Sequence, residues 1–90
     1  MQKITVDNDT GAPLTLWVEP LGEDYWLKPG ERFTVSSDTD LADPAGVAPF
    51  EVTVHARGIS VHSNVGHPAG VHDASGTELH CGHQRPTETP

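Results

Sequence analysis

Apolar and polar side chains alternate in short bursts along this chain, and this two-residue rhythm constrains the fold more than any other feature. In residues 14–18 and 50–54 every second side chain is large and apolar. Successive side chains of a β-strand point to opposite faces, so each burst predicts a half-buried strand. No stretch of ten or more residues shows the 3.6-residue spacing of an amphipathic helix. The pattern therefore predicts an all-β protein, a small antiparallel β-sandwich or barrel of six to seven strands.

The length and the turn-forming residues indicate a single domain. The chain has 90 residues, including nine Gly and eight Pro, which favour many turns over long helices. We place one β domain at residues 1–83. Residues 84–90 are polar and contain two prolines, so we expect a flexible C-terminal tail. Residues 36–49 and 64–70 lack the alternation and are predicted to be loops.

A Lys-Pro-Gly-Glu sequence at Lys28–Glu31 marks one reversal of the chain. Proline presets φ and glycine accepts a positive φ, as a type II turn requires. We expect a hairpin across this turn, in which Trp26 lies beside Phe33.

Two later reversals set the register of further hairpins. The run Asp73–Thr77 suits a type I turn followed by a glycine bulge, which places Val71 opposite Leu79. In the preceding hairpin, a loop of two or four residues near Arg57-Gly58 would set Val54 against Val61 and keep Ile59 inside.

The inward rows of these strands predict the hydrophobic core. Its expected members are Leu14, Leu16, Val18, Trp26, Phe33, Val35, Phe50, Val52, Val54, Ile59, Val61, Val71, Leu79 and Cys81.

The charge balance narrows the classes of partner. Thirteen acidic and five basic side chains give a formal net charge of −8. Such a surface repels phosphate backbones and anionic lipid, so we expect neither nucleic acid nor a membrane as partner. The N-terminal residues show no apolar signal-peptide stretch, and a single Cys cannot form an internal disulfide. We therefore expect a cytoplasmic protein.

Histidines and the single thiol are concentrated in the second half of the chain. All six histidines lie between His55 and His83, and the run closes on His80-Cys81-Gly82-His83. Thiolate and imidazole are ligands for Zn, Cu or Ni. Cys81, His83, His80, His55 and His62 are thus candidate ligands of a transition-metal site.

The alternation argues against one site that uses all of these groups. If Leu79 points inward, Cys81 and His83 do too, whereas His80 points outward. His55 and His62 would form an outward pair on the opposite face, with Cα atoms roughly 7–8 Å apart. In the alternative interpretation Cys81 is a small core residue, the histidines are outward polar positions, and the protein has no cofactor.

Two aromatic side chains are expected on an outer face. Trp17 lies between two inward residues, and Tyr25 precedes an expected inward Trp26. Tryptophan and tyrosine are enriched in binding hot spots, so Trp17 and Tyr25, with Glu19 on the same face as Trp17, form a candidate contact surface for a protein partner. Alternatively, the 20–25 loop folds over Trp17 and makes a second small core.

No motif indicates catalysis. Ser63, His62, His72 and Asp73 supply the residue types of a triad, as any histidine-rich chain would, and no nucleophile elbow, phosphate loop or zinc-protease motif is present. We expect a protein that is not an enzyme.

Two segments carry a resemblance. The segment Leu16-Trp17-Val18-Glu19-Pro20-Leu21-Gly22-Glu23-Asp24-Tyr25-Trp26-Leu27-Lys28-Pro29-Gly30-Glu31 and the closing Cys81-Gly82-His83-Gln84-Arg85-Pro86 resemble a group of small uncharacterised β-rich actinobacterial proteins. The resemblance spans nearly the whole chain and implies an origin, but it implies no activity and no site residues. The favoured hypothesis is a non-catalytic interaction or accessory module that binds a protein partner or itself through exposed aromatics or a sheet edge. The alternative is a transition-metal-binding protein.

Overall fold

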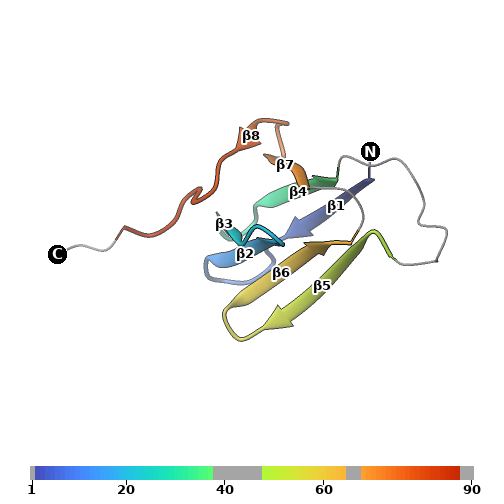
Figure 1. Cartoon of the computed structure of the whole chain (residues 1–90). Helices are drawn as coiled ribbons and strands as arrows, with labels where there is room; N and C mark the ends of the chain where they lie inside the picture. The colour runs from blue at the N-terminus through green and yellow to red at the C-terminus, as the bar shows by residue number, and fades with distance from the viewer. Residues whose placement is uncertain (1, 38–47, 65–67, 88–90) are drawn as a thin grey trace.

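The structure is a computed structural model that describes residues 2–37, 48–64 and 68–87. These residues form eight strands and no helix, and therefore no helix that could cross a membrane. The strands are β1 (Gln2–Asp7), β2 (Leu14–Glu19), β3 (Glu23–Leu27), β4 (Arg32–Ser37), β5 (Phe50–His55), β6 (Gly58–Ser63), β7 (Pro68–Asp73) and β8 (Glu78–Leu79) (Figure 1). The all-β prediction is confirmed, whereas the count of six to seven strands is wrong. Residues 38–47 and 65–67 of the two predicted loops lie outside the described residues.

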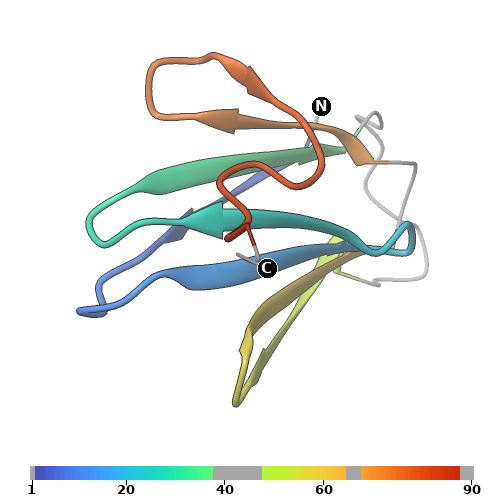
Figure 2. The same ribbon diagram turned by 90° about the vertical axis from the view of Figure 1, so that its left-hand side faces the viewer.

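The eight strands form two sheets of four. Sheet A has the order β1-β4-β7-β8, and sheet B has the order β3-β2-β6-β5. The two sheets face each other as the layers of a sandwich (Figure 2), and the described strands do not close into a barrel. Every pairing between two of the described strands is antiparallel except that of β2 with β6, which is parallel. Sheet B is therefore mixed, and the prediction of a purely antiparallel fold is wrong for this pair.

The core lies between the two sheets and uses the inward row of each strand. Its buried apolar residues are Val6, Leu16, Val18, Tyr25, Leu27, Phe33, Val35, Val61, Val71 and Leu79. Ile4, Leu14, Phe50 and Ile59 pack against this cluster and are partly buried. Most of the predicted core is confirmed, because the alternation correctly identifies which face of β2, β4, β6 and β7 turns inward.

Four predicted core residues lie elsewhere. Trp26 is half-buried on the outer face, because β3 enters sheet B with Tyr25 and Leu27 inward. Cys81 is exposed, because β8 ends at Leu79 and the two-residue rhythm stops there. Val52 and Val54 point inward but are exposed, because sheet A does not extend over β5.

The predicted turn at Lys28–Glu31 is present, but it does not join a hairpin. The amide of Glu31 donates to the carbonyl of Lys28 at 3.0 Å, and Gly30 has a φ of 84°, as a type II turn requires. β3 then pairs with β2, while β4 pairs with β1 and β7. The turn thus carries the chain from one sheet to the other, and the predicted pairing of Trp26 with Phe33 is wrong.

The two other predicted hairpins exist. In β7–β8 the partners are Val71 with Leu79, as expected, and Gly76 at φ 88° donates to the carbonyl of Asp73. In β5–β6 the loop has two residues, but it lies one residue earlier than expected. Val54 therefore opposes Ile59 rather than Val61.

A buried asparagine ties the first loop to the turn between the sheets. Asn8 is 1% exposed, and its side-chain amide donates to the carbonyls of Ala12 at 2.9 Å and Leu27 at 3.0 Å. Its side-chain oxygen accepts from the amide and the hydroxyl of Thr10. Its backbone exchanges further hydrogen bonds with Gly30 and Glu31. Asn8 thereby connects the end of β1 to the end of β3.

Candidate interaction surface

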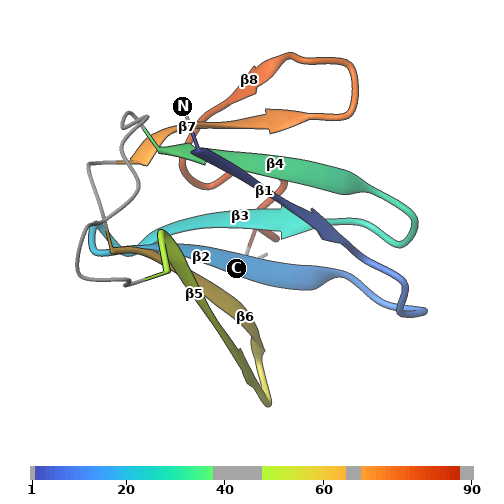
Figure 3. The same cartoon turned by 90° about the vertical axis from the view of Figure 1, so that its right-hand side faces the viewer.

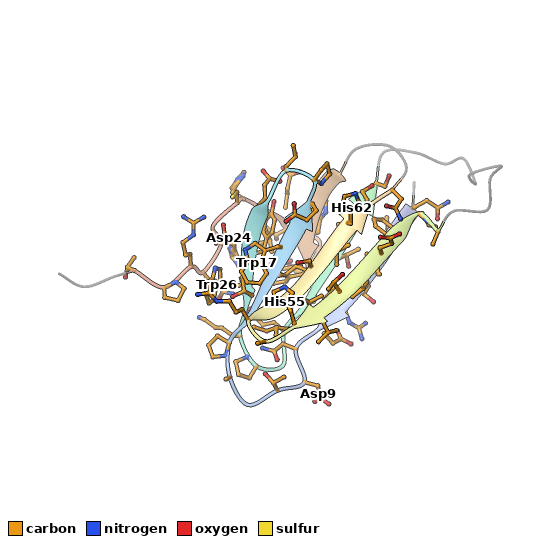
Figure 4. All side chains as sticks on the ribbon, turned by 60° about the horizontal axis from the view of Figure 1, so that its bottom comes forward. Asp9, Trp17, Asp24, Trp26, His55 and His62 are labelled. Atoms are coloured by element: carbon orange, nitrogen blue, oxygen red, sulfur yellow. The ribbon has the colours of Figure 1, made fainter. Side chains whose placement is uncertain are left out.

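The outer face of sheet B carries two indoles and an imidazole, which we call the aromatic face (Trp17, Trp26 and His55). Trp17 and His55 have ring centroids 5.0 Å apart. Trp26 lies across the sheet beside Thr15, whose other neighbour is Gly58. Figure 4 shows the three rings at one end of the sheet, with His62 farther along β6. The prediction that Trp17 faces outward is confirmed, although the ring is only half-exposed.

A glycine makes room for the Trp17 ring. A Cβ on Gly58 would lie 2.1 Å from the carbonyl oxygen of Thr15 and 3.2 Å from a ring carbon of Trp17. Gly58 also has a φ of 152°, which L residues rarely adopt. The parallel pairing of β2 with β6 and the position of Trp17 both depend on the missing side chain.

Tyr25 does not belong to this face. It is 4% exposed and lies in the core, where its hydroxyl donates to a carboxylate oxygen of Glu23 at 3.3 Å. Burial, together with the negative charge of Glu23, raises the pKa of Tyr25 to about 12. The prediction that Tyr25 is an exposed contact residue is wrong, and Trp26 occupies the outward position.

The segment after β8 is bound along the free edge of β3. Gly82 donates to the carbonyl of Asp24, and the amide of Trp26 donates to the carbonyl of His83, each within 3 Å. The side-chain amide of Gln84 donates to the carbonyl of Trp26 at 2.7 Å. Figure 2 shows this red segment alongside β3.

An ion pair fixes the same segment. The carboxylate of Asp24 accepts from Arg85 Nε at 2.7 Å and from the indole nitrogen of Trp26 at 2.9 Å. The Arg85 guanidinium holds the pKa of Asp24 well below its usual range. The side chain of Asp24 is 15% exposed, so this pair is more protected than an ordinary surface ion pair. Gln84 and Arg85, placed in the tail by the sequence, thus contact β3.

Glu19, the third predicted contact residue, also lies on the outer face of sheet B, at the end away from Trp26 and His55. It pairs across the sheet with His62, which in turn pairs with Glu51 on β5. A row of carboxylate, imidazole and carboxylate therefore crosses three strands. Glu19 is on the same face as Trp17, as predicted.

The candidate metal ligands do not come together. His55 and His62 belong to different rows of sheet B, because His55 pairs with Gly58 and His62 with Glu51. The expected diagonal placement of these two histidines, with Cα atoms roughly 7–8 Å apart, is therefore wrong. Within residues 2–37, 48–64 and 68–87, no three His, Cys, Asp or Glu side chains are grouped so that they could hold a metal ion.

The closing His-Cys-Gly-His segment turns instead of continuing as a strand. His83 donates its amide to the carbonyl of His80, and its ring packs edge-on against Phe33 at 5.6 Å between centroids. His80 and Cys81 are exposed. The Cys81 thiol is 3.6 Å from a carboxylate oxygen of Asp24 and donates toward it.

Three of the four sheet edges formed by the described strands are protected. The segment at residues 82–84 binds the edge of β3, β8 has only two residues, and β1 carries the exposed Lys3. Short strands, lysines and covering segments are the usual devices that prevent edge-to-edge pairing. β5 is the fourth edge. It has six residues with no lysine, no proline and no break in its register with β6.

Both faces of β5 are exposed to solvent over residues 51–55. Val52 is 48% exposed and Val54 is 77% exposed, although both lie on the inward side of sheet B. Figure 3 shows that the β5–β6 hairpin projects away from sheet A. Alternation predicts the direction of these side chains correctly, but the other sheet does not reach them.

Among the described residues, the main-chain groups of β5 that pair with no other strand belong to the same valines. Opposite residues of an antiparallel pair alternate between bonded and non-bonded pairs. The amide of Asn64 donates to the carbonyl of Pro49 at 2.9 Å, so the odd-numbered residues of β5 bond to β6. The amide and carbonyl groups of Val52 and Val54 therefore point to the free edge.

Comparison with known proteins gives no assignment. No protein-family model, curated protein or solved structure shows a significant match to this chain.

Proposed function

We propose that this chain is a non-catalytic interaction module that binds a protein partner by adding a strand to the free edge of β5. The observation that carries the proposal is the contrast between β5 and the other three edges. An unprotected edge strand offers a row of amide and carbonyl groups to an extended segment. Val52 and Val54 add exposed apolar area next to those groups.

The aromatic face extends the proposed contact surface. His55 belongs to β5 and its ring lies against Trp17, so a partner strand beside β5 would reach the edge of this face. Tryptophan contributes large apolar area with one hydrogen-bond donor, which suits a protein contact. Trp17 and Glu19 remain candidate contact residues on this basis.

Photo-crosslinking in cells that naturally express the chain tests the proposal. A benzophenone amino acid at position 54 should form a covalent adduct with a discrete protein, because this position adjoins the free edge. The same amino acid at exposed position 9, in the loop after β1, is the control and should give no adduct of that mass. The absence of a specific adduct from position 54 would contradict the proposal.

A backbone variant tests the strand-addition mode. Val54→Pro removes an amide that points to the free edge, and proline is tolerated on edge strands at such positions. The preceding Thr53 is already extended, as a residue before proline prefers. We expect the crosslink from position 52 to fall at least several-fold in this variant while the circular dichroism spectrum is retained. An undiminished crosslink would mean that the partner binds side chains only.

A further inference from the structure

We infer that the partner of β5 is the β5 strand of a second copy of this chain, paired antiparallel about a two-fold axis at Thr53. The inference rests on the proposed function, because it names the occupant of the same edge. It is carried by the free edge of β5 and by the sequence of the strand, Phe50-Glu51-Val52-Thr53-Val54-His55.

The strand is self-complementary about Thr53. In a two-fold pairing at that residue, Val52 lies opposite Val54 of the second copy, and Glu51 lies opposite His55 of the second copy. The two valine pairs fall on the inward face, and the Glu–His pairs fall on the outward face. Side chains that can hydrogen-bond across strands are favourable pairs, and β-branched side chains pack well against neighbours on a pleated surface.

The alternation of main-chain hydrogen-bonding groups along β5 permits this register. The free amide and carbonyl groups of β5 belong to its even-numbered residues, as the bond between Asn64 and Pro49 shows. Val52 and Val54 of the second copy are also even-numbered, so each valine pair would exchange two main-chain hydrogen bonds. Thr53 and its mate would form a non-bonded pair at the centre.

Moving the two-fold axis by one residue in either direction loses this complementarity. With Val52 on the axis, Glu51 would face Thr53 of the second copy. With Val54 on the axis, His55 would face Thr53 of the second copy. Only the pairing centred on Thr53 brings a carboxylate opposite an imidazole. Nε2 of His55 shares a hydrogen bond with the hydroxyl of Ser60 at 3.1 Å, so Nδ1 is the ring nitrogen that would donate to the carboxylate of the second copy.

The pairing of Glu51 with His55 of the second copy allows a test in which two harmful substitutions compensate for each other. Glu51→Lys would remove the carboxylate that accepts from the imidazole, and His55→Glu would place two carboxylates opposite each other. Each single change acts at both symmetric pairs, so we expect the dimer dissociation constant to rise about tenfold or more. The double variant E51K/H55E places lysine opposite glutamate, a favourable opposite-charge pair, and should return the constant to within about threefold of the wild type.

Sedimentation equilibrium of the purified 90-residue chain over a concentration series measures these constants. Glu78→Lys on β8 is the matched control, because it makes the same charge change at an exposed edge-strand residue of the other sheet; it should leave the constant unchanged. The side chains at positions 51 and 55 are exposed, so these variants should keep the circular dichroism spectrum of the wild type. A double variant no better than the worse single variant would overturn the inference.

Disulfide trapping tests the register without changing a charge. In a Cys81→Ser background, Thr53→Cys would face its own mate at a Cα separation of about 4.5 Å, which lies within the range for a disulfide. Glu51→Cys in the same background is the control, because it would face His55. Under mild oxidation we expect Thr53→Cys to form a covalent dimer at least tenfold faster than Glu51→Cys. Equal rates, or a faster 51 variant, would overturn the inference.

The two proposals can fail separately. If the purified chain is a monomer at the highest concentrations measured and position 54 crosslinks in cells to a protein of a different mass, then the self-pairing is wrong and strand addition stands. If position 54 crosslinks to nothing in cells and the purified chain is a monomer, both are wrong. A crosslinked species of twice the chain mass supports both.

Discussion

Leu16 on β2 and Val54 on β5 lie in the same inward row of sheet B, joined through Ile59 on β6, yet their surroundings are opposite. Leu16 is 0% exposed, whereas Val54 is 77% exposed. Both side chains point to the same side of the sheet, and the difference arises because sheet A covers β2 but does not extend over β5. The direction of a side chain and its burial are thus separate properties of this fold.

The same substitution of valine by threonine at positions 54 and 61 of the β5–β6 hairpin measures this difference in burial. Val54→Thr should change the free energy of unfolding by less than about 0.5 kcal/mol, because the side chain is already in solvent. Val61→Thr should lower it by about 1–3 kcal/mol, because Val61 is 0% exposed and the hydroxyl would be buried. Urea denaturation at low micromolar protein concentration gives both values. Equal effects would show that Val54 is covered in solution.

Gly58→Ala should destabilise the protein by about 2 kcal/mol or more. The new Cβ would meet the carbonyl of Thr15 and the ring of Trp17, and the φ of 152° is unfavourable for alanine. Gly11→Ala is the matched control, because nothing lies within 4 Å of its Cβ position and its φ is not positive. We expect the control to lie within about 0.5 kcal/mol of the wild type in the same denaturation experiment. A similar stability for both variants would mean that β2 and β6 can shift apart at no cost.

Asn8→Ala should lower the free energy of unfolding by about 2 kcal/mol. The change leaves the carbonyl of Leu27 without its side-chain donor in a buried place. Asn8→Asp should be at least as harmful, because a carboxylate cannot donate to the carbonyls of Ala12 and Leu27. The neighbouring Asp9→Ala serves as the control, since Asp9 is exposed. If thermal denaturation shows the same stability for Asn8→Ala and Asp9→Ala, then the hydrogen bonds of Asn8 do not stabilise the connection between β1 and β3.

The single tyrosine of the chain should ionise far above its ordinary range. Burial and the Glu23 carboxylate raise the pKa of Tyr25 to about 12, compared with about 10 for an exposed tyrosine. The folded state therefore prefers the neutral phenol. Its contribution to stability is complete below pH 10 and is lost as the pH rises toward 12. Ultraviolet titration of tyrosinate absorbance measures the shift, with the urea-unfolded chain as reference; a folded chain that titrates near pH 10 would contradict the burial of Tyr25.

Acid should weaken the attachment of residues 82–85 to β3. Arg85 lowers the pKa of Asp24, so the ionised carboxylate favours the folded state. This contribution is present above the ordinary aspartate pKa of about 3.9 and is lost as the pH falls below it. The stability difference between wild type and Asp24→Asn should therefore shrink when denaturation is repeated at decreasing pH from 6 to 3. A constant difference across this range would contradict the linkage.

Local sequence signals located most turns and the facing of most strands. The type II turn at Lys28–Glu31 and the bulged hairpin at Asp73–Thr77 were both predictable, because each depends on a glycine at a position with positive φ. The outward direction of Trp17 was predictable from its buried neighbours. These features depend on residues that are close together in the chain.

The parts of the surface that the sequence misplaced depend on distant residues. Tyr25 and Trp26 are adjacent aromatics, and either could have faced inward. The register of β3 on β2 selects Tyr25, and the acceptor on Asp24 satisfies the indole nitrogen of Trp26. The segment from Cys81 to Arg85 was equally ambiguous, because its partners are the backbone and carboxylate of β3, almost 60 residues earlier (Gln84 to Trp26 is a separation of 58).

Local patterning was enough to predict an all-β protein and the apolar side of most strands, because side-chain alternation is a local property of an extended backbone. Long-range packing sets which inward residues are covered, which sheet edges are protected and where the histidines lie relative to one another. Those outcomes depend on strand order, on the parallel contact of β2 with β6 and on the reach of one sheet over the other. Val54 illustrates both: its inward direction follows from its place in a five-residue pattern, and its exposure follows from the absence of a facing strand among the described residues.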